Sequence, residues 1–131
     1  MVYKNYLEII LKWISALTIV SGLVQILAPG FVLNMIGGEI NDSTMYMFGI
    51  IGMFMMLFGG LLLQALFSKK DHPVAVLWCA LQKFGAGVAV TLAVGSGLFS
   101  LLALGVALFD LFSGVLIAIY WYSISKKEST L

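Results

Sequence analysis

The stretch that decides the fold begins at Lys83 and ends at Asp110, and it reads KFGAGVAVTLAVGSGLFSLLALGVALFD. It carries one charge at each end and none between them. Two apolar segments flank the sequence Gly95-Ser96-Gly97, which is a turn signal. The pattern predicts a hairpin of two apolar helices with one ionisable residue well inside each helix.

The two charges are expected to lie at the same depth in this hairpin. Lys83 stands 13 residues before Ser96, and Asp110 stands 14 residues after it. With a rise of about 1.5 Å per residue, the two positions differ in depth by only about 1.5 Å. A charge near the centre of a membrane helix costs roughly 2.5–3.5 kcal/mol on insertion scales. We therefore expect Lys83 and Asp110 to neutralise each other as an ion pair.

Two roles for this pair remain open. A buried ion pair can set the register of two helices, and the small residues around both charges allow close packing. Intramembrane charges also mark ion or proton pathways, and they can anchor the head group of a ligand. Lys83 and Asp110 are therefore the candidate residues for a ligand site or an ion pathway.

The rest of the chain shares this apolar character. Of its 131 residues, 62% are hydrophobic and 10% are charged, the net charge is +1, and arginine is absent. Soluble domains carry about 25% charged residues, and nucleic-acid binders need a basic face. The composition thus excludes a nucleic-acid partner and a disordered chain, and it indicates an integral membrane protein.

Four runs reach the length of about 20 apolar residues that a transmembrane helix needs. They cover residues 7–27, 45–67, 74–94 and 98–124. We predict an all-α integral membrane protein, a four-transmembrane-helix antiparallel bundle that forms a single membrane domain over residues 1–131.

Residues 41–44 offer N-cap side chains to the second helix. Residues 31–36 are apolar but too short to span, so we expect a short outer interfacial segment. A lid over a cavity is the alternative.

The lysines predict the orientation. With four spans, both termini and the second loop lie on one side, which holds six of the seven lysines: Lys4, Lys12, Lys69, Lys70, Lys126 and Lys127. The first loop holds only Glu39 and Asp42. By the positive-inside rule, both termini are expected in the cytoplasm, with the protein in the plasma (inner) membrane.

The second run combines methionine with glycine. Gly52, Met56, Gly59 and Gly60 recur at i, i+4, i+7 and i+8 and are expected to share a face of the helix. Such a face can accept another helix closely. It can alternatively line a slot of the size of a lipid or quinone, because methionine adapts to irregular apolar pockets.

Candidates for chemistry are few. Cys79 and His72 are each the single residue of their type, so the sequence offers no cysteine or histidine cluster for a metal. Carboxylates are not clustered either, which leaves few candidates for an acid, a base or a nucleophile. We predict no catalytic residue, no metal and no cofactor. Glu8 lies four residues from Lys4 and Lys12 and is expected to pair with them, and Gln25 is expected to meet interfacial water.

Pro29 at the end of the first helix, the short apolar segment after it, FGIIG at residues 48–52 and FGG at residues 58–60 form a recognisable layout. This layout resembles small bacterial four-helix membrane proteins of the DoxX-like kind. Such proteins often carry an arginine near that glycine position, and this chain has none. The resemblance implies a four-helix bundle with an accessory membrane role, and it transfers no site residues.

These features favour a small, non-enzymatic membrane protein that binds a lipophilic ligand or a partner protein. The alternative is a small oligomeric transporter or channel that uses Lys83 and Asp110. The expected partners are the lipid bilayer, a lipid or other lipophilic small molecule, a second copy of the chain, or another membrane protein.

Overall fold

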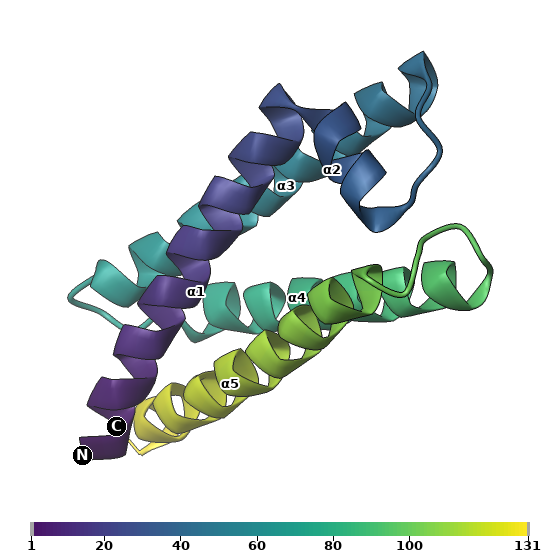
Figure 1. Ribbon diagram of the computed structural model, residues 1–131. Helices are drawn as coiled ribbons and strands as arrows, with labels where there is room; N and C mark the ends of the chain where they lie inside the picture. Colours follow the sequence, from purple (N-terminus) through teal and green to yellow (C-terminus); the bar gives the residue numbers. More distant parts are fainter. Residues whose placement is uncertain (1, 131) are drawn as a thin grey trace.

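A computed structural model of the protein describes residues 2–130 and shows only helices and connecting turns there (Figure 1). The helices are α1 (Val2–Leu27), α2 (Pro29–Ile36), α3 (Asp42–Phe67), α4 (Pro73–Gly95) and α5 (Ala103–Ser129). Four of them, α1, α3, α4 and α5, are long and apolar enough to cross a membrane. The predicted all-helical class and the predicted number of membrane-length helices are confirmed.

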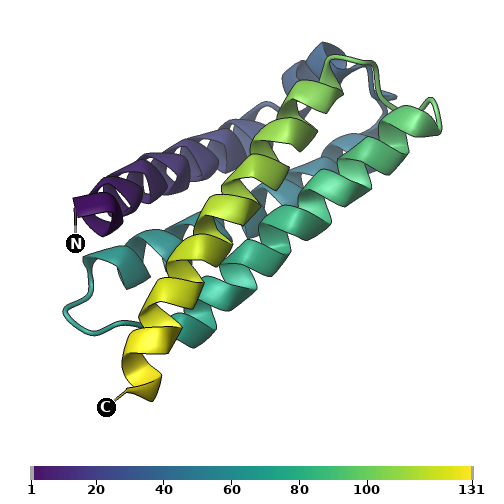
Figure 2. The same ribbon diagram turned by 90° about the horizontal axis from the view of Figure 1, so that it is seen from below.

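The long helices are arranged as two side-by-side pairs. Helix α1 packs along α3 and α4 packs along α5, whereas contacts between the pairs are sparse. Both chain ends lie at one end of the molecule, which we call the terminal end (Figures 1 and 2). Helix α2 and the loop of residues 96–102 lie at the opposite end, which we call the α2 end.

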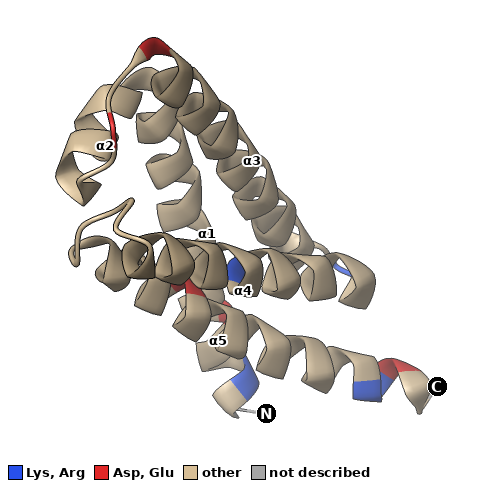
Figure 3. Ribbon diagram, turned by 90° about the vertical axis from the view of Figure 1, so that its right-hand side faces the viewer, with Lys and Arg blue, Asp and Glu red and all other residues tan. Residues whose placement is uncertain are grey.

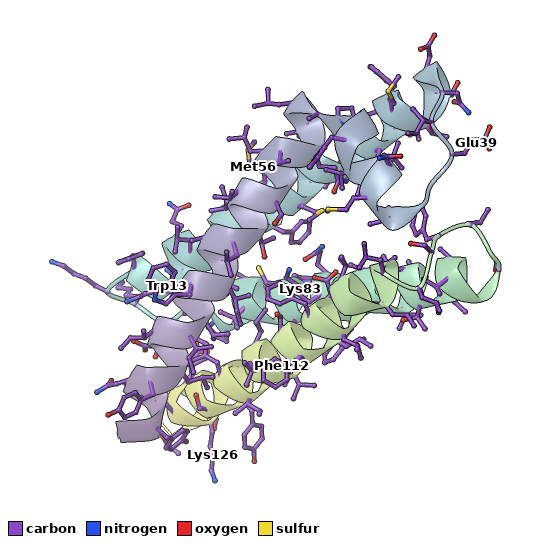
Figure 4. All side chains as sticks on the ribbon, viewed as in Figure 1. Trp13, Glu39, Met56, Lys83, Phe112 and Lys126 are labelled. Carbon is purple, nitrogen blue, oxygen red and sulfur yellow. The ribbon has the colours of Figure 1, made fainter. Side chains whose placement is uncertain are left out.

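The apolar core lies in the half of the molecule nearer the terminal end, where the two pairs meet. Its buried side chains come from all four long helices: Leu7, Leu11, Ile14, Leu62, Leu66, Val76, Cys79, Ala80, Ile117, Tyr120 and Ile124. Towards the α2 end the two pairs spread apart, as Figure 1 shows. Many large apolar side chains face outward, and Trp13 and Phe112 are 69% and 63% exposed (Figure 4).

Helix α2 is the short apolar segment expected from the sequence. Pro29 stands in its first turn, where a missing backbone N–H costs nothing. Gly37 ends it with a left-handed φ of 75°, and the N–H of Gly38 returns to the carbonyl of Leu33. Leu33 and Ile36 are buried, so this helix packs against the rest of the protein and is not a free loop.

The fourth predicted span is wrong at its start. It was expected to begin at Leu98 after a tight turn, but α5 begins at Ala103 and a loop of residues 96–102 precedes it. The reason is a contact with α2: the N–H and the Oγ of Ser100 both donate to the Ile36 carbonyl, at 2.8 and 3.0 Å. A helical Ser100 would point its N–H along its own helix, so the chain leaves the helix to cap α2.

The start of α3 carries the cap that residues 41–44 predicted. The side chain of Asn41 accepts from the Thr44 N–H at 2.9 Å, and Thr44 Oγ1 accepts from the Asn41 N–H at 3.0 Å. This reciprocal pair is a capping box, and it satisfies two backbone donors that the helix itself leaves free.

Replacing Asn41 by alanine is expected to lower the free energy of unfolding by about 1 kcal/mol, because one N-terminal N–H of α3 loses its acceptor. Thermal unfolding in detergent, followed by circular dichroism, measures the change. Ser43→Ala is the control, since Ser43 lies in the same exposed turn and its side chain makes no hydrogen bond within residues 2–130. Equal melting temperatures for the two variants would contradict the capping role.

Candidate functional site

Lys83 of α4 and Asp110 of α5 form a buried ion pair. The Lys83 Nζ lies 3.0 Å from the Asp110 Oδ1, and the two residues are only 5% and 6% exposed. The predicted pairing is therefore confirmed, and it is the one ion pair within residues 2–130. Figure 4 shows Lys83 in the middle of the molecule.

The pair has a third partner that sequence reasoning missed. Thr18 Oγ1 accepts a hydrogen bond from the Lys83 Nζ at 2.9 Å and donates one to the Ile14 carbonyl at 2.8 Å. The ammonium thus joins α1, which belongs to one helix pair, to α4 and α5, which form the other pair. The available signal was a polar residue at the centre of an apolar run, but no count along the chain relates Thr18 to a residue 65 positions away.

The backbones of Lys83 and Asp110 lie at different depths, contrary to the prediction, although their side chains meet. A Cβ on Gly87 would lie 2.6 Å from Leu111 Cγ and 3.1 Å from the Ala107 carbonyl oxygen, so the turn of α5 that holds Asp110 packs at the level of Gly87. The backbone of Lys83 is therefore about one turn, roughly 6 Å, nearer the terminal end than that of Asp110. The offset follows from the loop before α5, and the long lysine side chain spans it.

The surroundings of the ammonium leave little free space. A cavity of about 10 Å³ lies beside it, with a lining of Ser15, Thr18, Phe58, Gly59, Leu62, Cys79, Gln82, Lys83 and Ile117. One water needs about 10–15 Å³ measured in this way, so the cavity has room for no more than one. An ammonium has three donors, and two of them are used by Asp110 and Thr18. The third is free to donate to such a water.

The face predicted on the second helix packs mainly against α1. A Cβ on Gly22 of α1 would lie 2.5 Å from the Gly52 carbonyl oxygen and 2.8 Å from the Met56 backbone nitrogen, and Gly59 meets α1 in the same way. Gly60 is different, since no neighbouring atom lies within 4 Å of its Cβ position. The reason is rotational, because Gly60 lies about 80° around the helix from Gly52.

An apolar groove of about 570 Å³ lies at the α2 end, where α1, α2 and α3 meet. Its lining residues are Ile26, Pro29, Asp42, Met45, Tyr46, Gly49, Ile50 and Met53. Small-molecule sites have volumes of about 300–1,000 Å³ and mostly apolar walls. The methionine-rich character of α3 was noted in the sequence, but the predicted pocket face was the one with Gly52, Met56, Gly59 and Gly60, which lies next to the face that lines the groove. The lining residues Asp42, Tyr46, Gly49 and Met53 recur at i, i+4, i+7 and i+11, and this spacing could have identified the groove face from the sequence.

Two expectations about other polar residues are wrong. Glu8 Oε1 accepts from the Tyr120 hydroxyl at 3.3 Å, and it forms no ion pair with either nearby lysine within residues 2–130. Lys12 instead places its Nζ 4.4 Å from the centre of the Phe67 ring. Gln25 does not meet water: it is 5% exposed and donates to the Phe48 carbonyl at 2.8 Å. In each case a neighbouring helix supplies the partner that the isolated helix lacks.

Metal-binding geometry is not found in the described part of the chain. Residues 2–130 contain no group of three or more histidine, cysteine, aspartate or glutamate side chains close enough to hold a metal ion. Comparisons with protein families, curated proteins and solved structures found no match to this chain. Its function is therefore argued from its own geometry.

Proposed function

We propose that the protein is a multi-pass plasma (inner) membrane protein that binds a lipophilic molecule in the groove at the α2 end. The groove, with its volume of about 570 Å³ and its mostly apolar lining, is the observation that carries this proposal. The four long apolar helices would cross the bilayer as an antiparallel bundle. A non-enzymatic accessory role, as in the DoxX-like proteins that the layout resembles, is consistent with this architecture.

The distribution of charge supports one orientation. Six lysines lie in the half of the molecule near the terminal end, whereas Glu39 and Asp42 lie at the α2 end, which Figure 3 shows without basic residues. By the positive-inside rule the terminal end faces the cytoplasm. The α2 end then lies at the outer interface, and the groove extends inward along α3 from Asp42 to Met53, over about 16 Å. A lipophilic molecule could therefore enter it from the outer leaflet.

The burial of Lys83 and Asp110 and the small free volume beside Lys83 support a structural role for the pair more than a transport role. An ion pathway needs a wet route to the charged groups. The cavity beside Lys83 has room for about one water, and the ammonium is already bound to Asp110 and Thr18. We propose that the pair sets the mutual position of three helices while the groove binds the ligand.

Blocking the groove is expected to abolish binding. The probe is a long-chain alcohol with a photoreactive diazirine in its tail, added to the protein in phosphatidylcholine nanodiscs, and mass spectrometry locates the label. We expect labelling within residues 42–53, where the groove lies. Gly49→Phe should reduce it about tenfold or more, the equivalent of about 1.4 kcal/mol of binding. Gly49 has open space around its Cβ position, so the larger side chain fills the groove without striking the backbone.

Gly60→Phe is the matched control. Gly60 belongs to the same helix and also has open space at its Cβ position, but it does not line the groove. This variant should retain the labelling of the unaltered protein. The proposal fails if residues 42–53 are not labelled, or if Gly49→Phe and Gly60→Phe are labelled to the same extent.

A further inference from the structure

We infer that the groove selects a single-chain amphiphile with a cationic head, and that the Asp42 carboxylate holds this head. The inference rests on the proposed lipophile binding and adds the chemical class of the ligand. Asp42 is the one charged residue in the groove lining. Within residues 2–130 its carboxylate takes part in no ion pair, so its charge is available to a ligand.

Asp42 is not needed to cap its helix. An acidic residue in the first turn of a helix interacts favourably with the helix dipole, and this alone often explains its presence. In α3, however, the capping box is formed by Asn41 and Thr44, and the Asp42 side chain is not part of it. Its carboxylate is left at the mouth of the groove without a protein partner among the described residues.

The charge around the groove favours a cationic head over a phosphate. Glu39 lies in the same loop region, where its carboxylate accepts from the Asn41 side chain at 3.0 Å. All described lysines lie elsewhere: in α1, in the loop after α3, at position 83 and near the end of α5. Figure 3 shows acidic residues and no basic residue at this end. A phosphate head would meet like charges there with no cation to bind it, which disfavours a phospholipid.

The groove places the parts of such a ligand in order along α3. Asp42 and Tyr46 are four residues apart and lie on one face, and Gly49 and Met53 continue that stripe. A carboxylate and an adjacent aromatic ring are the groups that bind an alkylammonium head. Gly49 leaves open space for a tail, and flexible methionine side chains fit against it. The volume of about 570 Å³ suits one chain.

The test compares three diazirine probes with the same alkyl tail and with a trimethylammonium, a hydroxyl or a sulfonate head, in phosphatidylcholine nanodiscs at physiological salt. The apparent affinity is read from labelling of residues 42–53 as a function of probe concentration. We expect the cation to bind about tenfold tighter than the alcohol and the sulfonate to bind most weakly. Asp42→Asn should reduce the affinity for the cation to that for the alcohol and leave the alcohol unchanged.

The variant Glu39→Gln tests whether the cationic head binds Asp42 directly or is attracted by the general negative charge at the α2 end. It removes the same charge from the same end, but Glu39 does not line the groove, so the preference for the cation should persist. The melting temperature of Asp42→Asn should fall only slightly, because the capping box is intact and only the interaction of the charge with the helix dipole is lost. Equal affinities for the cation and the alcohol, or equal losses in Asp42→Asn and Glu39→Gln, would overturn the inference while the proposed function stands. If none of the three probes labels the groove, the proposed function itself is contradicted.

Discussion

Replacing Asp110 by asparagine is expected to lower the free energy of unfolding by about 3–5 kcal/mol, the cost of leaving one member of a buried ion pair without its counter-charge. Lys83 is 5% exposed, and its remaining partners would be neutral groups: the hydroxyl of Thr18 and the Phe109 ring, whose centre lies 5.3 Å from the Nζ. Because asparagine has the same shape as aspartate and keeps the packing, the decrease in the free energy of unfolding measures the contribution of the negative charge. Titration with sodium dodecyl sulfate in mixed micelles, followed by helicity, measures the change.

The double variant Lys83→Met with Asp110→Asn tests whether the two residues stabilise the fold as a pair or each by itself. Methionine has a length similar to lysine and carries no charge, so the double variant should recover much of the stability that Asp110→Asn loses. Equal stability of the single and the double variant would show that the pair does not act as a unit. Thr18→Val should have a smaller effect than Asp110→Asn, since the ammonium keeps its counter-charge.

Replacing Gly22 by alanine is expected to force α1 and α3 apart, with a loss of about 1–3 kcal/mol in the free energy of unfolding. The added Cβ would lie 2.5 Å from the Gly52 carbonyl oxygen and 2.8 Å from the Met56 nitrogen. Both are backbone atoms, so no side chain can rotate away to make room. The same titration in mixed micelles gives the change in stability.

Gly60→Ala is the control for this prediction. Gly60 is also helical and belongs to the same helix pair, but no atom lies within 4 Å of its Cβ position. Because alanine is the better helix former by about 1 kcal/mol, this variant should be as stable as the unaltered protein or slightly more stable. A Gly22→Ala variant as stable as Gly60→Ala would mean that the close approach of α1 and α3 is absent in solution.

The ion pair of Lys83 and Asp110 was predictable from the sequence, but the relative depth of the two residues was not. Lys83 and Asp110 were paired correctly because two isolated charges in apolar helices have a large cost unless they meet, whatever the detail of the turn. The estimate of their depth was off by about one turn, since it assumed that helix continues on both sides of Gly95-Ser96-Gly97. Ser100 instead leaves the helix to bind the end of α2.

Apart from the pairing of Lys83 with Asp110, contacts between distant segments were not predicted, and they form most of the ion-pair surroundings and of the groove. Thr18 binds Lys83 from another helix pair, and Gln25 bonds to the Phe48 carbonyl rather than to water. The groove needs three helices together, since Ile26, Pro29 and the residues of α3 line it jointly. Periodicity gives the face of one helix, but it does not say which other helix covers that face.

The sequence by itself determined the number of membrane-length helices, the cap of α3 and the pairing of the two internal charges. These features depend on local quantities: the length of an apolar run, the residue type at a helix start and the energy of an isolated charge. Only the tertiary structure decided that α1 packs on α3 through Gly22 and Gly52, that Thr18 completes the ion pair, and that a groove remains beside Asp42. Those features depend on the rotation and offset of one helix against another, which are set by close packing over the whole contact surface.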